Sequence, residues 1–194
     1  MVWRNLRQQN HKPTGRPNLC LSDFVAPHET GVADWIGAFA VTAGGGIDER
    51  VAAFEAALQR VLEQHKIEIV CLAGFMRLLT ADFTRRWDGK MLNIHPALLP
   101  AFKGLDTHRR ALEAKVLQHG ATVHFVVPEM DEGPIVAQAA VPVLDDDTPE
   151  TLGARVLEQE HVIYPLALRL VASGAVRVEG NRVIGALSHS ADRL

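Results

Sequence analysis

Residues 67–94, IEIVCLAGFMRLLTADFTRRWDGKMLNI, predict a strand, a short helix and a second strand in close succession. The β-branched run 67–72 is typical of a buried strand. Thr80 is a favourable N-cap residue, so we predict a helix over 80–87 and the next strand over 90–94. Strands that alternate with helices in this way indicate an α/β domain with a largely parallel sheet.

The flanking sequence continues the alternation. Upstream, apolar residues at three- and four-residue spacings predict an amphipathic helix over 47–64. Downstream, we predict a helix over 107–118 closed by Gly120, strands over 121–127 and 135–143, a helix from 149 to about 172, and a hairpin over 175–187 that turns at Gly180-Asn181. Residues 1–46 show no sustained period and are left unassigned.

Composition excludes several classes of protein. The 194 residues carry a net charge of −3, with 20 Lys and Arg against 23 Asp and Glu, so a nucleic-acid partner is not predicted. No apolar run reaches the roughly 20 residues of a transmembrane helix, and the N-terminus lacks a signal-peptide core. The two cysteines, Cys20 and Cys71, suit a reducing compartment. We therefore expect a cytoplasmic protein without a membrane partner, either a monomer or a homodimer.

Polar side chains follow two of the predicted strands. Asn93 and His95 come two residues apart at the end of one strand, so the alternation of side chains places both on one face. In α/β sheets this end of a strand is where ligands bind. An amide donor beside an imidazole forms a pair suited to acid catalysis and to stabilising an oxyanion. A histidine that is merely hydrogen-bonded at a strand end has the same pattern.

The second polar stretch is the Gly- and Pro-bounded loop Glu129-Met130-Asp131-Glu132. A carboxylate held there near an imidazole would favour the protonated ring, although an ordinary turn also contains such acids. His108 and His124 are candidates for orienting neighbours or for purely structural roles. The spacing of these residues lacks the His-x-x-x-His or Cys-x-x-Cys patterns of metal sites, so no metal is predicted.

Three motifs occur in one order: LAGFMRLL at 72–79, LNIHPALLPAFKGLDTH at 92–108 and HGATVHFVVPEMDEGPIVAQ at 119–138. The chain from about residue 48 to 185 resembles the phosphoribosylglycinamide formyltransferase family. The resemblance implies a Rossmann-like three-layer fold with a mostly parallel central sheet, and a domain over 47–187 followed by a tail at 188–194. It also implies small-molecule substrates: transfer of a formyl group from 10-formyltetrahydrofolate, as co-substrate, to the amine of glycinamide ribonucleotide, in purine synthesis.

The resemblance implies roles for individual residues. Asn93 and His95 would stabilise a tetrahedral intermediate, and Asp131 would assist His95 with the proton. Folate would contact a set of residues from three segments: Met76, Arg77, Leu78, Leu79, Asn93, Glu129, Met130 and Asp131. Glu160 would contact glycinamide ribonucleotide.

The sequence departs from the family in two places. The Gly-x-Gly-Ser-Asn loop that grips the nucleotide phosphate has no counterpart in residues 1–46, which suggests an incomplete, disordered or frameshifted N-terminal part. Asp106 stands where the family often has His. A formyltetrahydrofolate deformylase, in which water replaces the amine, and a catalytically impaired remnant are the alternative readings.

Overall fold

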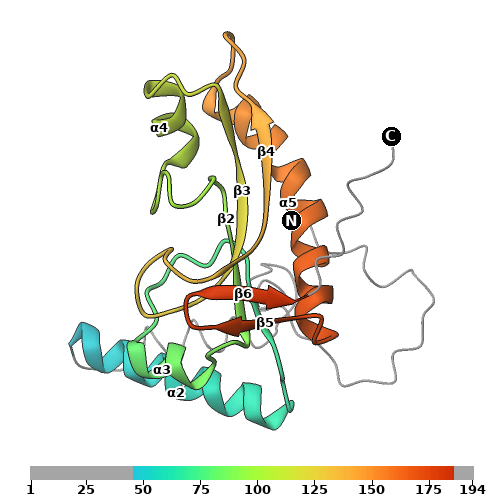
Figure 1. Cartoon of the computed structure of the whole chain (residues 1–194). Helices are drawn as coiled ribbons and strands as arrows, with labels where there is room; N and C mark the ends of the chain where they lie inside the picture. The colour runs from blue at the N-terminus through green and yellow to red at the C-terminus, as the bar shows by residue number, and fades with distance from the viewer. Residues whose placement is uncertain (1–45, 186–194) are drawn as a thin grey trace. The chain divides into compact units, whose positions relative to one another are not determined.

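The computed structural model describes residues 46–185, which form two compact units that meet in sequence between Lys90 and Met91. The predictions for residues 1–45 and for the tail at 188–194 lie outside the described residues. The described residues are drawn in colour in Figure 1.

The first unit contains helix α2 (Ile47–Gln64), strand β1 (Val70–Leu72) and helix α3 (Ala81–Arg86). Helix α2 has the predicted bounds, because its buried residues, among them Phe54 and Leu58, recur at helical spacing. Thr80 is the N-cap of α3 as predicted: its hydroxyl accepts a hydrogen bond from the Phe83 amide at 3.2 Å.

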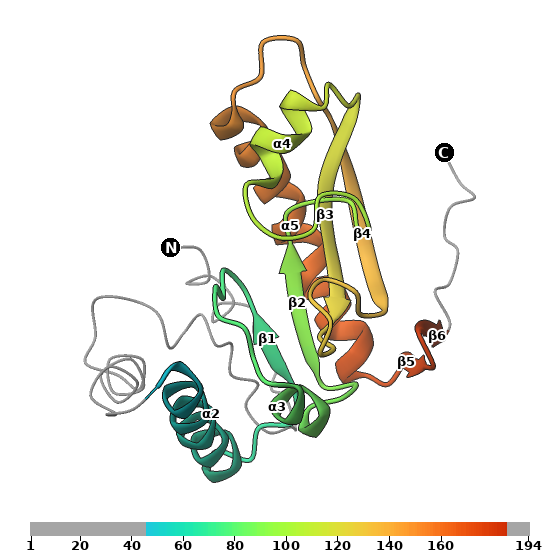
Figure 2. The ribbon, with the colours of Figure 1, turned by 90° about the vertical axis from the view of Figure 1, so that its left-hand side faces the viewer.

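The second unit is an antiparallel sheet with one long helix. Its elements are β2 (Met91–His95), α4 (Thr107–Glu113), β3 (Gln118–Phe125), β4 (Ile135–Pro142), α5 (Pro149–Ala172), β5 (Val176–Glu179) and β6 (Arg182–Gly185). Strand β3 lies between β2 and β4, and α5 runs along β3 and β4 (Figures 1 and 2). Strands β5 and β6 form the predicted hairpin.

The α/β class is confirmed, but strand direction in this unit differs from the prediction of a mostly parallel sheet. Strand β2 pairs antiparallel with β3, and β3 pairs antiparallel with β4. A parallel pair needs a crossover of a dozen or more residues, usually with a helix. Only residues 126–134 separate β3 from β4, which is too few for such a crossover. Helix α4, between β2 and β3, is too short to cover a sheet face, so β3 runs back beside β2.

The helix predicted over 107–118 ends at Glu113, and the proposed cap, Gly120, lies inside β3. Lys115 adopts a left-handed conformation with φ 51° and breaks the helix before Gly120 is reached. Glycine is needed at position 120 for a different reason: a Cβ there would collide with the Ala139 carbonyl oxygen on β4. Gly120 therefore allows two backbones to approach closely and does not cap the helix.

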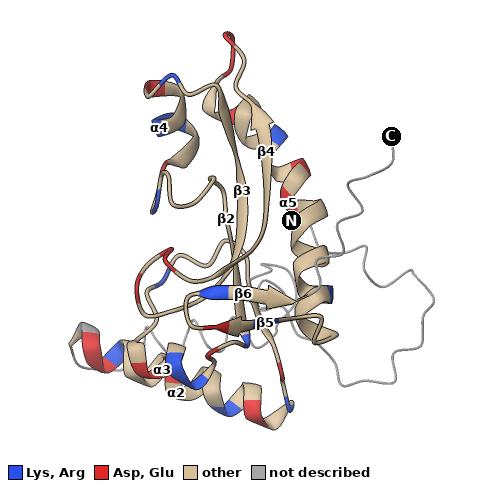
Figure 3. Ribbon diagram, in the orientation of Figure 1, with Lys and Arg blue, Asp and Glu red and all other residues tan. Residues whose placement is uncertain are grey.

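The pairing of β3 with β4 contains a register shift beside His124. Val123 pairs with Ala137 and His124 pairs with Ile135, so Val136 is an extra residue on β4. Such a bulge bends the strand and redirects the neighbouring side chains. Neither strand contains Lys, Arg, Asp or Glu, and both are tan along their length in Figure 3. The charged side chains around this sheet therefore come from its loops and from the neighbouring helices, as Arg155 of α5 does at Pro142.

A membrane-crossing helix is absent from residues 46–185: none of the helices there combines the length and apolarity that a bilayer requires.

Candidate functional site

The second unit brings together the three residues that the sequence predicted to be catalytic. Asn93 and His95 project from β2, and Asp131 lies in the loop between β3 and β4. The Nδ1 atom of His95 is 3.5 Å from Oδ2 of Asp131. The side chains of His95 and Asp131 are only 6% and 11% exposed. This shielding strengthens the attraction between a protonated imidazole and the carboxylate.

His124 joins this group from the neighbouring strand. It pairs with Asn93 in the β2–β3 register, and its Nε2 lies 3.3 Å from Nδ2 of Asn93 and 3.8 Å from Oδ1 of Asp131. Its Nδ1 lies 2.8 Å from the Phe125 carbonyl oxygen, which can only accept. Burial is the main cause that lowers the pKa of His124. The neutral ring therefore carries its proton on Nδ1, and Nε2 accepts from the Asn93 amide.

The loop after β2 completes the site with backbone groups. The Phe102 carbonyl oxygen accepts from Nε2 of His95 at 3.0 Å, and the Gly104 amide donates to Oδ2 of Asp131 at 2.8 Å. Phe102 and Gly104 both have positive φ, at 55° and 79°. The sequence did not reveal these contacts, because a backbone group carries no residue-type signal; only the glycine hinted at the turn.

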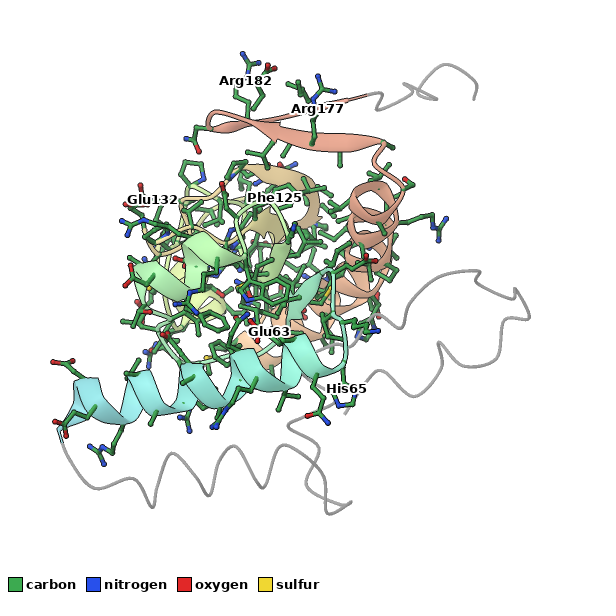
Figure 4. All side chains as sticks on the ribbon, turned by 90° about the horizontal axis from the view of Figure 1, so that it is seen from below. Glu63, His65, Phe125, Glu132, Arg177 and Arg182 are labelled. Carbon is green, nitrogen blue, oxygen red and sulfur yellow. The ribbon has the colours of Figure 1, made fainter. Side chains whose placement is uncertain are left out.

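An ion pair ties the two loops together. Lys103 Nζ, from the loop after β2, lies 2.8 Å from Oε1 of Glu132, beside Asp131. Figure 4 labels Glu132 and also Phe125, where β3 ends and the loop begins. Both side chains of the pair are partly exposed, so this contact restrains the loops weakly.

A second pair of histidines, His108 and His119, lies next to the loop after β2. His108 Nδ1 is 3.2 Å from His119 Nε2, and the His119 ring also meets the edge of Phe102. Burial, followed by the charge of His108, lowers the pKa of His119 to about 4. Among the described residues, Nδ1 of His119 is the buried side-chain polar atom that makes no hydrogen bond. From the sequence, His108 is a candidate for orienting a neighbour or for a structural role, and His119 is not singled out.

The other predicted residues lie on three different segments. Met76 to Leu79 follow β1 in the first unit, and Met76 and Leu78 are 78% and 76% exposed. Glu160 lies on α5, where burial raises the pKa of its carboxyl group; no contact among the described residues joins it to Asp131. Glu129 and Met130 share the loop of Asp131.

Asp106, the departure from the family, is the left-handed residue before α4, with φ 56°. It pairs with Arg109 on the first turn of that helix.

Residues 46–185 contain no group of three His, Cys, Asp or Glu side chains able to hold a metal ion.

Arranged in this way, the site offers an amide donor, an imidazole and a carboxylate within one shielded network. These groups can stabilise a negative oxygen and transfer a proton.

Comparison with known proteins places these residues in a family. The sequence pattern of the formyl transferase family matches residues 22–168. The matched range thus begins before residue 47, the start of the predicted domain.

Relatives and solved structures agree with this match. Phosphoribosylglycinamide formyltransferase of Escherichia coli is 44% identical over 129 residues, which are 66% of this chain and 61% of that protein. The human trifunctional purine biosynthetic protein adenosine-3 is 55% identical over 128 residues, 66% of this chain and 13% of that protein. The chain thus spans about three fifths of the single-function relative. The crystal structure of glycinamide ribonucleotide transformylase 1 from Symbiobacterium toebii is 52% identical, with a TM-score of 0.66 over 68% of this chain and 62% of that one.

A formyltetrahydrofolate deformylase from Pseudomonas syringae is also structurally similar. It is 30% identical, with a TM-score of 0.65, and the match covers 68% of this chain and 44% of that one.

Proposed function

Because the chain belongs to the formyl transferase family, we propose that it transfers a formyl group from 10-formyltetrahydrofolate to the amine of glycinamide ribonucleotide, a step of purine synthesis. The observation that carries the proposal is the buried contact of Asp131 with His95, in a network that also holds Asn93. A carboxylate, an imidazole and an amide can supply the proton transfer and the oxyanion donors that acyl transfer to an amine uses.

The first step is attack of the amine on the formyl carbon, which places negative charge on the formyl oxygen. Asn93 can donate to this oxygen, because its amide nitrogen has two hydrogens and only one is directed to His124. His95 supplies the second donor from Nδ1, since the Phe102 carbonyl already engages Nε2 and the 3.5 Å between Nδ1 and Oδ2 of Asp131 is longer than a typical hydrogen bond. Both donors are held in place before the charge develops, which is the source of their effect.

The second step is collapse of the intermediate, in which the C–N bond to the folate nitrogen breaks and that nitrogen receives a proton. Asp131, whose Oδ2 atom lies 3.5 Å from Nδ1 of His95, receives the proton that the attacking amine loses, directly or through water, and the same proton passes on to the folate nitrogen as the C–N bond breaks. The Gly104 amide keeps the carboxylate pointed at His95.

The remaining predicted residues would bind the folate and the nucleotide. Met76 to Leu79 and the loop of Glu129 to Asp131 would contact the folate, and the exposed apolar side chains of Met76 and Leu78 suit a planar heterocycle. Glu160 would contact the glycinamide ribonucleotide. The phosphate of that substrate has no assigned binding loop within the described residues.

A kinetic assay of the full chain with both substrates at saturation tests the proposal. We expect formyl transfer by the unaltered protein and a loss of roughly 10²–10³-fold in kcat for His95→Ala. Equal rates for the two proteins would remove His95 from the mechanism.

A deformylase reaction is the second candidate, and the structural similarity to the Pseudomonas syringae enzyme supports it. In that reaction water takes the place of the amine, so formate is released without glycinamide ribonucleotide. Formate production that is unaffected by adding the ribonucleotide would favour the deformylase over the transferase.

A further inference from the structure

The segment 74–80 of the first unit is held on one side by α2. Phe75 and Arg77 both pack on the ring of Phe54: the two aromatic rings are 6.5 Å apart, and the guanidinium carbon lies 4.9 Å above the Phe54 ring. Met76 and Leu78, by contrast, are 78% and 76% exposed, so their side chains are not packed on α2.

The C-terminal end of the segment is fixed by a carboxylate. Glu55, the neighbour of Phe54 on α2, is only 7% exposed and accepts two hydrogen bonds from Thr80. Its Oε1 accepts from the Thr80 amide and its Oε2 from the Thr80 hydroxyl, both at 2.5 Å. Hydrogen bonds to an ionised group are stronger than neutral ones, and a buried acceptor pair of this kind is costly to break.

We propose that Glu55, assisted by Phe54, is a positioning residue that holds segment 74–80 in the conformation that binds the pterin ring of the folate substrate. The proposal rests on the function proposed above and adds residues that the family motifs quoted earlier do not include. Its physical basis is pre-organisation: a loop that is already ordered loses less conformational entropy when a ligand binds. Glu55 acts through Thr80 and does not contact the ligand.

The decisive variants are Glu55→Gln and Thr80→Val. Glutamine keeps the size of Glu55 but replaces one of its two oxygens by an NH₂ group, so one of the two Thr80 donors meets a donor in place of its acceptor and the negative charge is lost. Valine keeps the shape of Thr80 and removes its hydroxyl. The probe is 10-formylfolate, a stable analogue of 10-formyltetrahydrofolate. We expect each variant to raise its Kd about 10-fold and to leave the Kd for glycinamide ribonucleotide unchanged.

Gln59→Leu is the matched control for lost stability. Gln59 also lies on α2, and its Oε1 accepts from Trp87 Nε1 at 3.0 Å, just beyond α3 and away from segment 74–80. This variant should lower Tm as the other two do but leave the Kd for 10-formylfolate unchanged. An equal rise in Kd for Gln59→Leu would show a general effect of stability and overturn the proposal.

Amide hydrogen exchange of residues 75–80 separates this proposal from the proposed function. We expect faster exchange there in Glu55→Gln and Thr80→Val and the unaltered rate in Gln59→Leu. If the unaltered protein fails to bind 10-formylfolate, the folate assignment is wrong, and the exchange rates alone then decide whether Glu55 orders the segment. Unchanged exchange or an unchanged Kd in Glu55→Gln overturns the role of Glu55.

Discussion

The amide of Asn93 donates to Nε2 of His124, and the ring of His124 is itself fixed by the Phe125 carbonyl. The orientation of the Asn93 carboxamide is thus set by a neutral histidine on the neighbouring strand. A flipped carboxamide would present its oxygen to Nε2, and two acceptors would then face each other.

Removal of the Asn93 amide should reduce the chemical step. We expect Asn93→Ala to lower kcat by roughly 10²–10³-fold, because one of two donors to the developing oxyanion is lost. The Kd for 10-formylfolate should change little, since the donor acts mainly in the transition state. Steady-state kinetics and calorimetry on the same preparation measure both quantities. A large change in Kd with an unaltered kcat would contradict the assigned role.

His124 should matter through Asn93 and less than Asn93 itself. We expect His124→Ala to lower kcat about 10-fold, the effect of one lost orienting hydrogen bond. In an Asn93→Ala background the same change should have almost no further effect on kcat, because the residue that it orients is gone. Additive losses in the double variant would show that His124 acts by another route.

The charge of Asp131 should be required for proton transfer. Asp131→Asn preserves the size of the side chain, yet we expect kcat to fall at least 10²-fold because the His95 proton loses its partner. Glu132→Gln is the control at the adjacent position. It breaks the exposed ion pair with Lys103 and should change kcat by less than about twofold.

Stability should decrease in acid because of His119. Its pKa is about 4 in the folded protein against an ordinary value of 6.5, so the unfolded chain binds more protons between these two values. This contribution to stability is complete above pH 6.5 and is lost as the pH falls towards 4. We expect His119→Phe to narrow the difference in Tm between pH 7 and pH 5. His65→Gln, a change at an exposed position on the first unit, is the control. If the Tm difference between pH 7 and pH 5 stays the same in His119→Phe, then His119 is not the cause of the loss of stability in acid.

Gly133 should resist substitution. A Cβ at this position would collide with the Phe125 carbonyl oxygen, the group that fixes His124. We expect Gly133→Ala to lower the free energy of unfolding by about 1–3 kcal/mol and to reduce kcat as well. Gly46→Ala has open space around its new Cβ and provides the control in a denaturation experiment. Equal stability of the two variants would contradict the crowding at Gly133.

The long elements could be predicted from the sequence because their patterns are strong. Helix α2 and helix α5 begin and end where apolar spacing and the Thr148-Pro149 start signal place them. Gly120 was misread because a glycine that permits close approach of strands looks the same in sequence as one that ends a helix. The antiparallel pairing of β2, β3 and β4 could not be predicted, because strand direction depends on how the chain returns, which local patterns do not encode.

The candidate site was predictable where it depends on side chains. Alternation along β2 placed Asn93 and His95 together, and family resemblance added Asp131, which the structure brings to His95. The contacts of Phe102 and Gly104 could not be predicted, since they use backbone atoms in positive-φ conformations. The anchoring of Thr80 by Glu55 spans 25 residues and leaves no periodic trace.

The extra residue Val136 on β4 has a consequence for how this domain can vary over evolution. His124 pairs with Ile135 on one side of the irregularity, and Val123 pairs with Ala137 on the other. The pairing of these strands therefore fixes how many residues lie between His124 and the start of β4, the stretch that contains Asp131. Individual side chains along these strands can be exchanged one for another. Gaining or losing a single residue within β3 or β4 would instead turn the following side chains to the opposite face. Length, more than composition, is therefore what selection must hold constant in this stretch.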